Sequence, residues 1–171
     1  MNSAALSTMP TPDDLVRIAL QEQQLQYAAF NEEAAWSLGS RLHSMAVTRK
    51  LAIVIDIRRV NHPLFYAALP GTTPDNAEWV RRKSNVTLRL HRSSYAVGLE
   101  TQAKETNLFD RYALSHADYA GHGGCFPIRV TGTSVVAAVT VSGLPMRADH
   151  ELAVEALCAE LGKDYESLRL A

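Results

Sequence analysis

The chain has 171 residues, of which 47% are hydrophobic and 20% are charged, proportions typical of a globular protein with a buried core. Its 17 basic and 18 acidic residues give a formal net charge of −1, which excludes a general electrostatic attraction to nucleic acid or to an anionic membrane. The two cysteines, Cys125 and Cys158, form neither a CxxC pair nor a disulfide framework, and this favours a cytoplasmic location.

The N-terminal part of the chain is predicted to be helical after a short leader. Residues 1–10 are expected to form a flexible leader without a signal-peptide pattern, and residues 11–171 a single domain without a membrane-spanning run. Thr11 is predicted to be the N-cap of a helix that continues through Tyr27. Asn31 is predicted to cap a second helix with apolar residues at helical spacing. These apolar residues are Ala35, Leu38, Leu42 and Met45.

A hairpin is expected next. The β-branched, apolar run LAIVIDI at residues 51–57 predicts a central strand covered on both faces. Asn61 and Pro63 mark a turn, and residues 64–69 are expected to return as the antiparallel partner.

Two helices should follow this hairpin. Thr73 is predicted to cap a third helix, whose inward-facing stripe contains Trp79 and Val86. Ser93 or Ser94 is predicted to cap a further, short helix.

The C-terminal part again shows regular patterns. Residues 125–130 and 134–142 are expected to form a second hairpin, with Pro127 marking either an edge strand or a bulge. A last helix should run over residues 147–161 and end at Gly162. Hairpin-joined strands that are apolar on both faces predict a mostly antiparallel sheet between layers of helices.

The segment HADYAGHGGCFPIRV is the first stretch that could carry chemistry. It places His122 between glycines, and glycines permit tight turns and a close approach of the backbone. The imidazole could ligate iron or relay a proton, or it could be an exposed side chain in a turn. Cys125 is a candidate thiolate or a small apolar residue that opens a strand.

The basic stretch WVRRKSN is the second stretch that could carry chemistry. Arg82 is expected to pair with Glu78 across one helical turn. Lys83 lies on the inward stripe, so it needs a buried carboxylate or a ligand anion, and Asp56 at the end of the apolar strand is a candidate partner. Arg81 and Arg82 could add a rim that binds carboxylate or phosphate, or they could belong to a solvated face.

The start of the last helix is the third. Asp149 in its first turn is favourable with the helix dipole. His150 points along the inward stripe, either as a core histidine or as part of a site with His122 if the two loops meet. The chain contains no phosphate loop, dinucleotide-binding motif or HExxH, and no metal site is predicted.

Several motifs in a fixed order carry a family resemblance over about residues 15–162: AWSLGSRL, VIDIRR, LFYAALPGTTPDNAEWVRRKSNV, SSYAVG, HGGCFPIRV and VTVSGLP with DHELAVEAL. The chain resembles an uncharacterised family described as haem-degrading-domain proteins. That family is similar to GlcG-like proteins, to the haem-binding sensory protein of actinomycetes and to the C-terminal domain of propanediol-type cobalamin adenosyltransferases. The residues that match the shared pattern are Asp56, Lys83, Gly123, Gly124, Ser142 and Asp149.

The resemblance implies a profilin-like α-β-α layered domain of the α+β class, with a central, mostly antiparallel five-stranded sheet. The residue patterns identify four of these strands. The resemblance also implies self-association into a dimer or a larger homo-oligomer.

Haem is the cofactor that the resemblance implies, bound non-covalently and with enzymatic degradation left undecided. Lys83, with Arg81 or Arg82, would contact the haem propionates. The alternative is a non-enzymatic oligomeric scaffold or a small-anion-binding protein, with a pocket shaped by the glycine-rich loop, Lys83 and Asp149. The candidate axial ligands are His122, His150 and His43.

Overall fold

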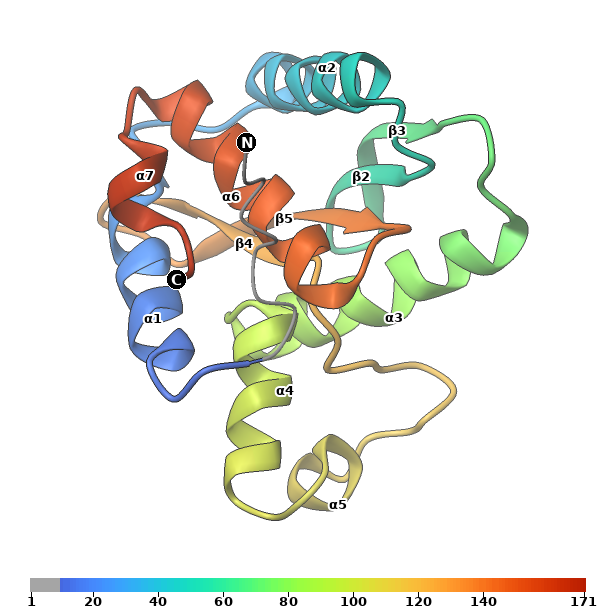
Figure 1. Cartoon of the computed structure of the whole chain (residues 1–171), viewed down its shortest axis with the longest axis vertical. Coiled ribbons are helices and arrows are strands. Elements are labelled where there is room, and N and C mark those ends of the chain that lie inside the picture. Colours follow the sequence, from blue (N-terminus) through green and yellow to red (C-terminus); the bar gives the residue numbers. More distant parts are fainter. Residues whose placement is uncertain (1–9) are drawn as a thin grey trace, which may run out of the picture.

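A five-stranded sheet lies between two layers of helices in the computed structural model, which describes residues 10–171 (Figure 1). The strand order is β1-β4-β5-β2-β3, and every neighbouring pair is antiparallel except β1 with β4. This arrangement confirms the predicted fold class. The predicted leader lies almost wholly outside the described residues, and the single domain stays a prediction. The strands are β1 (Gln26–Tyr27), β2 (Val54–Arg59), β3 (His62–Ala68), β4 (Cys125–Val130) and β5 (Val135–Ser142).

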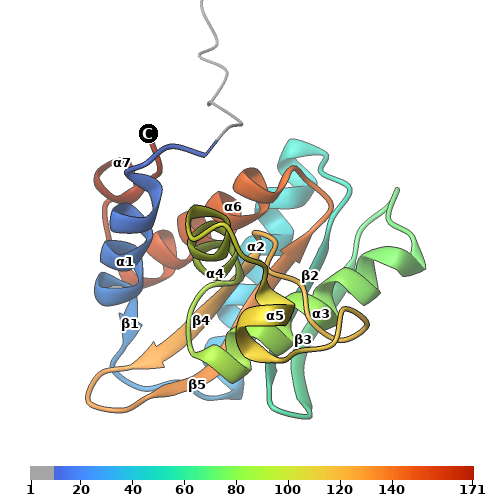
Figure 2. The ribbon, with the colours of Figure 1, turned by 90° about the horizontal axis from the view of Figure 1, so that it is seen from below.

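Helices cover both faces of this sheet. One layer consists of α2 and α6, and the other is formed mainly by α3 with the start of α4 (Figure 2). None of the helices between residues 10 and 171 is both long and apolar enough to cross a membrane. The helices are α1 (Asp14–Gln24), α2 (Glu32–Arg49), α3 (Pro74–Leu90), α4 (Ser94–Ala103), α5 (Leu108–Tyr112), α6 (Met146–Leu161) and α7 (Tyr165–Leu168).

The main core fills the space between the sheet and the α2–α6 layer. Ile55 and Ile57 of β2 are completely buried there with Leu38 and Leu42 of α2. Each of these side chains contributes about 1.5–3 kcal/mol by its burial. The apolar residues at helical spacing in α2 therefore form the buried face of the helix, as their spacing predicts.

The opposite interface, between the sheet and α3, contains buried polar groups. Ser84 and Thr140 hydrogen-bond through their hydroxyl oxygens at 3.0 Å. Asp56 is completely buried and lies opposite Thr140 in the β2–β5 pairing. Buried polar groups are costly unless they are paired, so this face of the sheet tolerates charge only where partners are built in.

Two expectations at the N-terminal end were wrong. The first helix begins at Asp14 rather than directly after Thr11, because the Thr11 hydroxyl donates to the Asp14 carboxylate at 2.8 Å instead of capping the helix. Tyr27 is not helical but belongs to β1, which pairs in parallel with Val130 and accepts a bond from the Thr131 N–H at 2.9 Å. This two-residue strand is the fifth strand of the sheet.

The predicted caps of three later helices are confirmed. Asn31 accepts from the backbone N–H of Ala34 at 2.9 Å, and Thr73 forms a capping box with Asn76. Ser93, one of the two candidates for the short helix, caps α4. A cap of this kind contributes about 1 kcal/mol, so these residues set the helix boundaries locally.

Pro127 lies where the sheet is irregular, as predicted. Strand β1 pairs only with Arg129 and Val130, so Pro127 has no neighbour on that side. The register of β4 against β5 shifts between Ile128 and Arg129. Proline can occupy this position because no ladder hydrogen bond requires its missing N–H.

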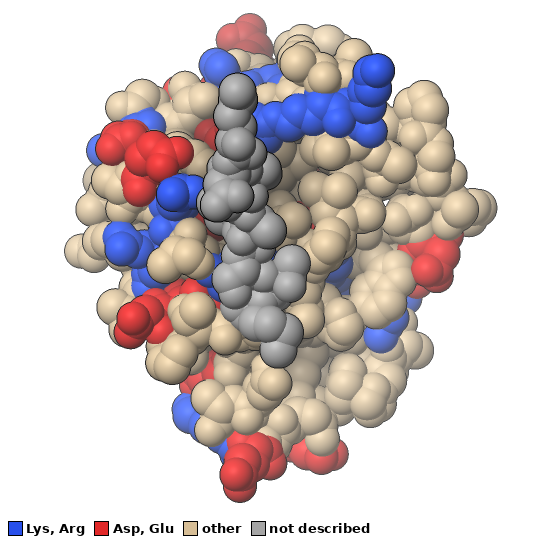
Figure 3. All heavy atoms as spheres, viewed as in Figure 1, with Lys and Arg blue, Asp and Glu red and all other residues tan. Residues whose placement is uncertain are grey.

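Charged side chains of both signs are interspersed on the face shown in Figure 3, as expected from a net charge of −1. Lys and Arg atoms form one elongated band across the top of this view, and elsewhere the two signs lie close together.

Candidate functional site

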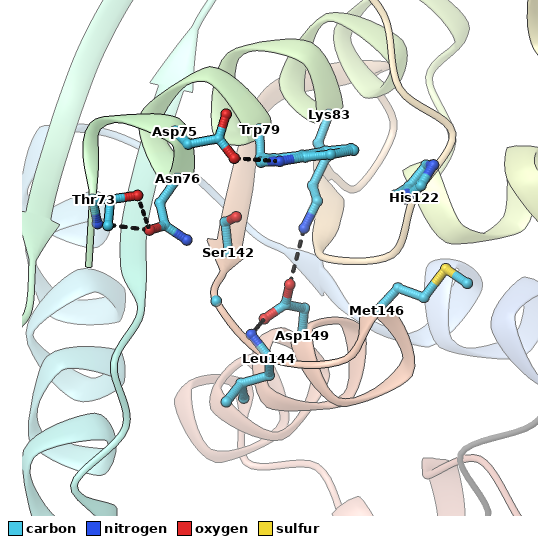
Figure 4. Close-up of a pocket in the computed structure, with 11 residues that line it drawn as sticks. Thr73, Asp75, Asn76, Trp79, Lys83, His122, Ser142, Leu144, Met146 and Asp149 are labelled. Atoms are coloured by element: carbon cyan, nitrogen blue, oxygen red, sulfur yellow. Dashed lines mark hydrogen bonds and ion pairs between the residues drawn. The ribbon is translucent and has the colours of Figure 1, made fainter. Parts of the chain in front are cut away.

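A pocket of about 360 Å³ opens between the start of α3, the loop before β4 and the start of α6 (Figure 4). It is lined by four residues that the sequence analysis singled out, although they lie on segments far apart in the chain. These four residues are Lys83, His122, Ser142 and Asp149.

The deep part of the pocket contains a buried ion pair. The Lys83 ammonium donates to Asp149 Oδ2 at 2.9 Å and to the Val141 carbonyl at 3.3 Å, and both charged side chains are at most 5% exposed. The predicted pair between Lys83 and Asp56 is therefore wrong. Asp56 instead accepts two bonds from Arg58, at 2.6 and 2.9 Å, because this arginine follows it on the same face of β2.

Burial controls the protonation of both carboxyl groups. Burial raises the pKa of Asp149 to about 6, against the lowering effect of Lys83 and of the Leu144 N–H, which donates to Oδ1 at 2.9 Å. Burial also raises the pKa of Asp56, and its pair with Arg58 opposes that shift. Asp149 is thus a carboxylate at neutral pH that takes up a proton under mildly acidic conditions.

The two glycines after His122 allow the loop to pass this ion pair. A Cβ atom on Gly123 would lie 2.0 Å from the Met146 carbonyl oxygen. Gly124 has a φ of +129°, and its Cβ would lie 2.3 Å from the Val141 oxygen and 2.8 Å from Lys83 Nζ. The glycines are required here because neither side chains nor an ordinary backbone conformation would fit.

His122 lies exposed at the mouth of the pocket. Its ring centroid is 4.9 Å from that of Trp79, and its backbone carbonyl accepts from Ser94 Oγ at 2.5 Å. The pKa of this imidazole is lowered mainly by partial desolvation and, to a smaller extent, by the positive charges of Lys83 and Arg82. The ring is therefore neutral at pH 7 and offers a nitrogen lone pair to a ligand.

Trp79 and Met146 are pocket residues that the sequence reasoning missed. Trp79 was expected to face the sheet, but its indole N–H donates to Asp75 Oδ2 at 3.0 Å and the half-buried ring lines the pocket. The spacing of four residues from Asp75 is a usable signal for this contact. Met146 is the first residue of α6, and its side chain is 46% exposed. The only sequence signal for this exposure is its position directly before the predicted start of the helix at residue 147.

The two arginines of the basic stretch have different environments. Arg81, not Arg82, pairs with Glu78, at 2.9 Å, so the predicted Arg82–Glu78 pair is wrong. The Arg82 guanidinium instead lies 4.8 Å from the centre of the Trp79 ring. This cation–π contact keeps Arg82 beside the pocket wall.

The other two histidine candidates lie outside the pocket. His150 is completely buried in α6, where it packs near aromatic rings and its Nε2 hydrogen-bonds to Gln21 Oε1 at 2.8 Å. Its position on the inward stripe confirms the core-histidine interpretation. His43 lies on the exposed face of α2. Of the three, only His122 lines this pocket.

His150 is expected to make the fold sensitive to acid. Burial lowers the pKa of His150 to about 3, with the Arg147 charge acting in the same direction and Asp14 opposing it. Between about pH 6.5 and pH 3 the unfolded chain thus binds a proton that the folded chain excludes, so stability falls as the pH drops, by about 1.4 kcal/mol per pH unit. Urea unfolding between about pH 4 and pH 7 measures this slope.

The matched variant is His150→Gln, which retains a donor for Gln21 but does not titrate. The free energy of unfolding of this variant should fall less steeply as the pH drops. The slope should be smaller by the contribution of one proton, about 1.4 kcal/mol per pH unit. Parallel profiles for the two proteins would contradict this role of His150.

The cysteines and carboxylates of residues 10–171 do not form a metal centre, since no group of three or more His, Cys, Asp or Glu side chains is close enough to hold an ion. Cys125 and Cys158 are completely buried, and burial raises the pKa of each thiol to about 11. Both are therefore small core residues in the thiol form.

The sequence and the fold of this chain are both similar to those of known proteins. A family model described as "Haem degrading protein HbpS-like" matches residues 30–158. A UPF0303 protein of Acidobacterium capsulatum is 54% identical over 162 residues, which cover 95% of this chain and 98% of that protein.

Two solved structures show the same arrangement of elements. The Ybr137w protein superposes with a TM-score of 0.81 at 26% identity, covering 88% of this chain and 89% of that chain. A PduOC:haem complex superposes with a TM-score of 0.65 at 14% identity, covering 77% and 94%, and this likeness shows the fold alone.

Proposed function

The chain belongs to the HbpS-like family of haem-degrading proteins, and we propose that it binds haem or a related tetrapyrrole non-covalently at the pocket beside His122. The observation that carries this proposal is the exposed, neutral imidazole of His122 against the Trp79 ring. A nitrogen lone pair next to an aromatic face suits a flat macrocycle with a central metal.

The residues around His122 fit such a ligand. His122 and Met146 lie at the end of the pocket opposite Thr73 (Figure 4). Histidine nitrogen and methionine sulfur are both known axial ligands of haem iron, and Met146 is exposed enough to reach a ligand. His150 does not compete, because it is completely buried and its Nε2 is hydrogen-bonded.

A bound haem would supply the redox chemistry of its iron, while the chain's own residues would bind and orient it. The Trp79 ring would cover one edge of the ligand, and His122 would hold its nitrogen toward the metal. A similar fold, that of PduOC, is known in complex with haem, and this supports the proposal. We also propose that the protein is located in the cytoplasm, because its two cysteines are buried and form no disulfide.

A haemin titration tests this function. The wild-type protein should show saturable, near-stoichiometric binding with a shifted Soret band, because the His122 imidazole would hold the haem iron through a ring nitrogen. His122→Ala should weaken binding at least about tenfold, the effect of losing about 1.4 kcal/mol. His43→Ala is the matched control, since His43 is exposed outside the pocket, and it should bind as the wild type does. Weak, non-saturating binding that is unchanged in both variants would contradict the proposal.

The second candidate is an oligomeric scaffold, and one observation favours it. Large apolar side chains are exposed on α2 and around the edge strand β3: Trp36 and Val60 are 66% exposed and Tyr66 is 51% exposed. Strand β3 pairs with β2 alone among the strands of residues 10–171. A second copy could cover this edge, because unpaired strand edges favour association. A failed haemin titration would leave this reading ahead.

A further inference from the structure

A second, smaller pocket shares His122 with the first. Its volume is about 240 Å³, and it is lined by residues of α3, α4, the start of α5 and the segment before β4. This volume is below the ~300 Å³ at which pockets for whole ligands begin, so it suits a single functional group. The lining contains one formal positive charge, Arg82, and no acidic side chain.

The wall of this second pocket is built by two glycines. A Cβ atom on Gly98 of α4 would lie 1.9 Å from the Gly121 carbonyl oxygen. Helix α4 therefore packs backbone to backbone against the residue before His122. This contact fixes the position of the chain at residue 121, and the next residue, His122, lines the second pocket.

Within the described part of the chain, the Arg82 side chain has no hydrogen-bond acceptor. Its Nε atom is buried and has no hydrogen-bond partner, and no carboxylate among residues 10–171 forms an ion pair with its guanidinium. Arg81, next to it on α3, uses Glu78, Asp118 and the Ala117 carbonyl as acceptors. A buried N–H without an acceptor is unfavourable, so an anionic acceptor that reaches Nε of the half-buried Arg82 gains the full value of the contact.

We propose that the second pocket binds a carboxylate group through Arg82. The planar guanidinium fork matches a carboxylate in shape and charge, and the Trp79 ring holds it in place from one side. Gln102 and Thr106 add an amide and a hydroxyl to the lining.

The carboxylate has two chemical sources. It is either an arm of the ligand held at His122, in which case this inference rests on the proposed function, or a free small carboxylate. His122 lines both pockets, so a ligand on its imidazole lies within reach of the second pocket.

The first arm of the test compares haemin with its dimethyl ester, in which both carboxylates are blocked. The wild-type protein should bind haemin at least about tenfold more tightly, the value of one charge-assisted contact. Arg82→Gln should remove this preference. Arg81→Gln is the matched control on the same helix, and it should keep the preference, because Arg81 lines neither pocket.

The second arm uses free propionate and the fluorescence of Trp79. A Trp36→Phe background leaves Trp79 as the single tryptophan, and Arg82 lies over its ring. Propionate should change the emission saturably in this background and not after Arg82→Gln. Thermal melting with the circular dichroism signal should confirm that both arginine variants fold as the wild type does.

The outcomes separate the two proposals. Equal binding of haemin and its ester, together with no effect of propionate on Trp79, would overturn the carboxylate site and leave haem binding standing. If haemin fails to bind at all, the proposed function is overturned and the propionate titration alone decides this inference. Tighter binding of haemin than of its ester identifies the tethered arm as the source, and a propionate effect without that preference identifies the free carboxylate.

Discussion

Gly124→Ala is expected to lower the free energy of unfolding by at least about 3 kcal/mol. The φ of +129° at this position is one that side-chain-bearing residues rarely adopt. The new Cβ would also lie 2.3 Å from the Val141 carbonyl oxygen of β5, a strand held on both sides by β4 and β2. The strand cannot yield, so the loop must move away from Lys83 and distort the pocket.

Gly132→Ala is the matched control. Gly132 also has a positive φ, of +79°, but nothing lies within 4 Å of its Cβ position in the β4–β5 turn. It should lose only the conformational cost of about 1–2 kcal/mol. Urea unfolding followed by circular dichroism measures both variants. Equal losses would show that the close approach at Gly124 contributes nothing beyond its backbone conformation.

Lys83→Met is expected to cost about 3–5 kcal/mol at neutral pH, because it leaves the Asp149 carboxylate buried without its cation. Burial already raises the pKa of Asp149 to about 6 in the presence of Lys83, and removing the ammonium raises it further. Protonation then neutralises the carboxyl, so the loss should be smaller at about pH 5 than at about pH 8.

The direction of this pH dependence is set by the difference in the pKa of Asp149 between the folded and the unfolded chain. The ordinary pKa of an aspartate is 3.8, so the folded wild-type chain binds a proton at Asp149 more readily than the unfolded chain does. This residue's contribution therefore rises as the pH falls from about 6 toward 3.8, and the variant extends that window upward.

Two controls distinguish the buried pair from charge in general. The double variant Lys83→Met with Asp149→Leu should recover much of the loss, because an apolar pair can replace a buried ion pair. Arg81→Met removes two pairs, with Glu78 and Asp118, in which every partner is at least 37% exposed, and it should cost at most about 1 kcal/mol for each pair. A deficit for Lys83→Met that is the same at both pH values would contradict the proposed cause.

The elements with strong local signals could be predicted from the sequence. The capping residues Asn31 and Thr73 begin their helices as expected, because a cap acts within one turn of the chain. Strand β4 matches its predicted bounds. Strand β1 could not be predicted, since two residues are too few to show a period and Tyr27 pairs only through contacts distant in sequence.

The partners of the charged residues were harder to predict than the elements. Helical spacing indicates that Lys83 faces the sheet, but only the position of the start of α6 relative to α3 in three dimensions shows that Asp149, not Asp56, lies next to its ammonium. Arg82 was assigned to Glu78 by the four-residue rule, whereas the nearby Trp79 ring competes for its guanidinium. The grouping around the pocket was accessible only through the family resemblance, because its members lie on distant elements.

The order of the strands also governs how the pocket comes into being during folding. The hairpins β2–β3 and β4–β5 close over short loops, whereas the pairing of Val54 with Ser142 joins segments separated by about half of the chain. Such non-local pairing closes late and slowly, because its loop entropy must be overcome first. Ser142, at that seam, lines the pocket together with α3 and α6. The pocket therefore exists only in the completely folded molecule, so a ligand that bound there would stabilise the whole fold against unfolding.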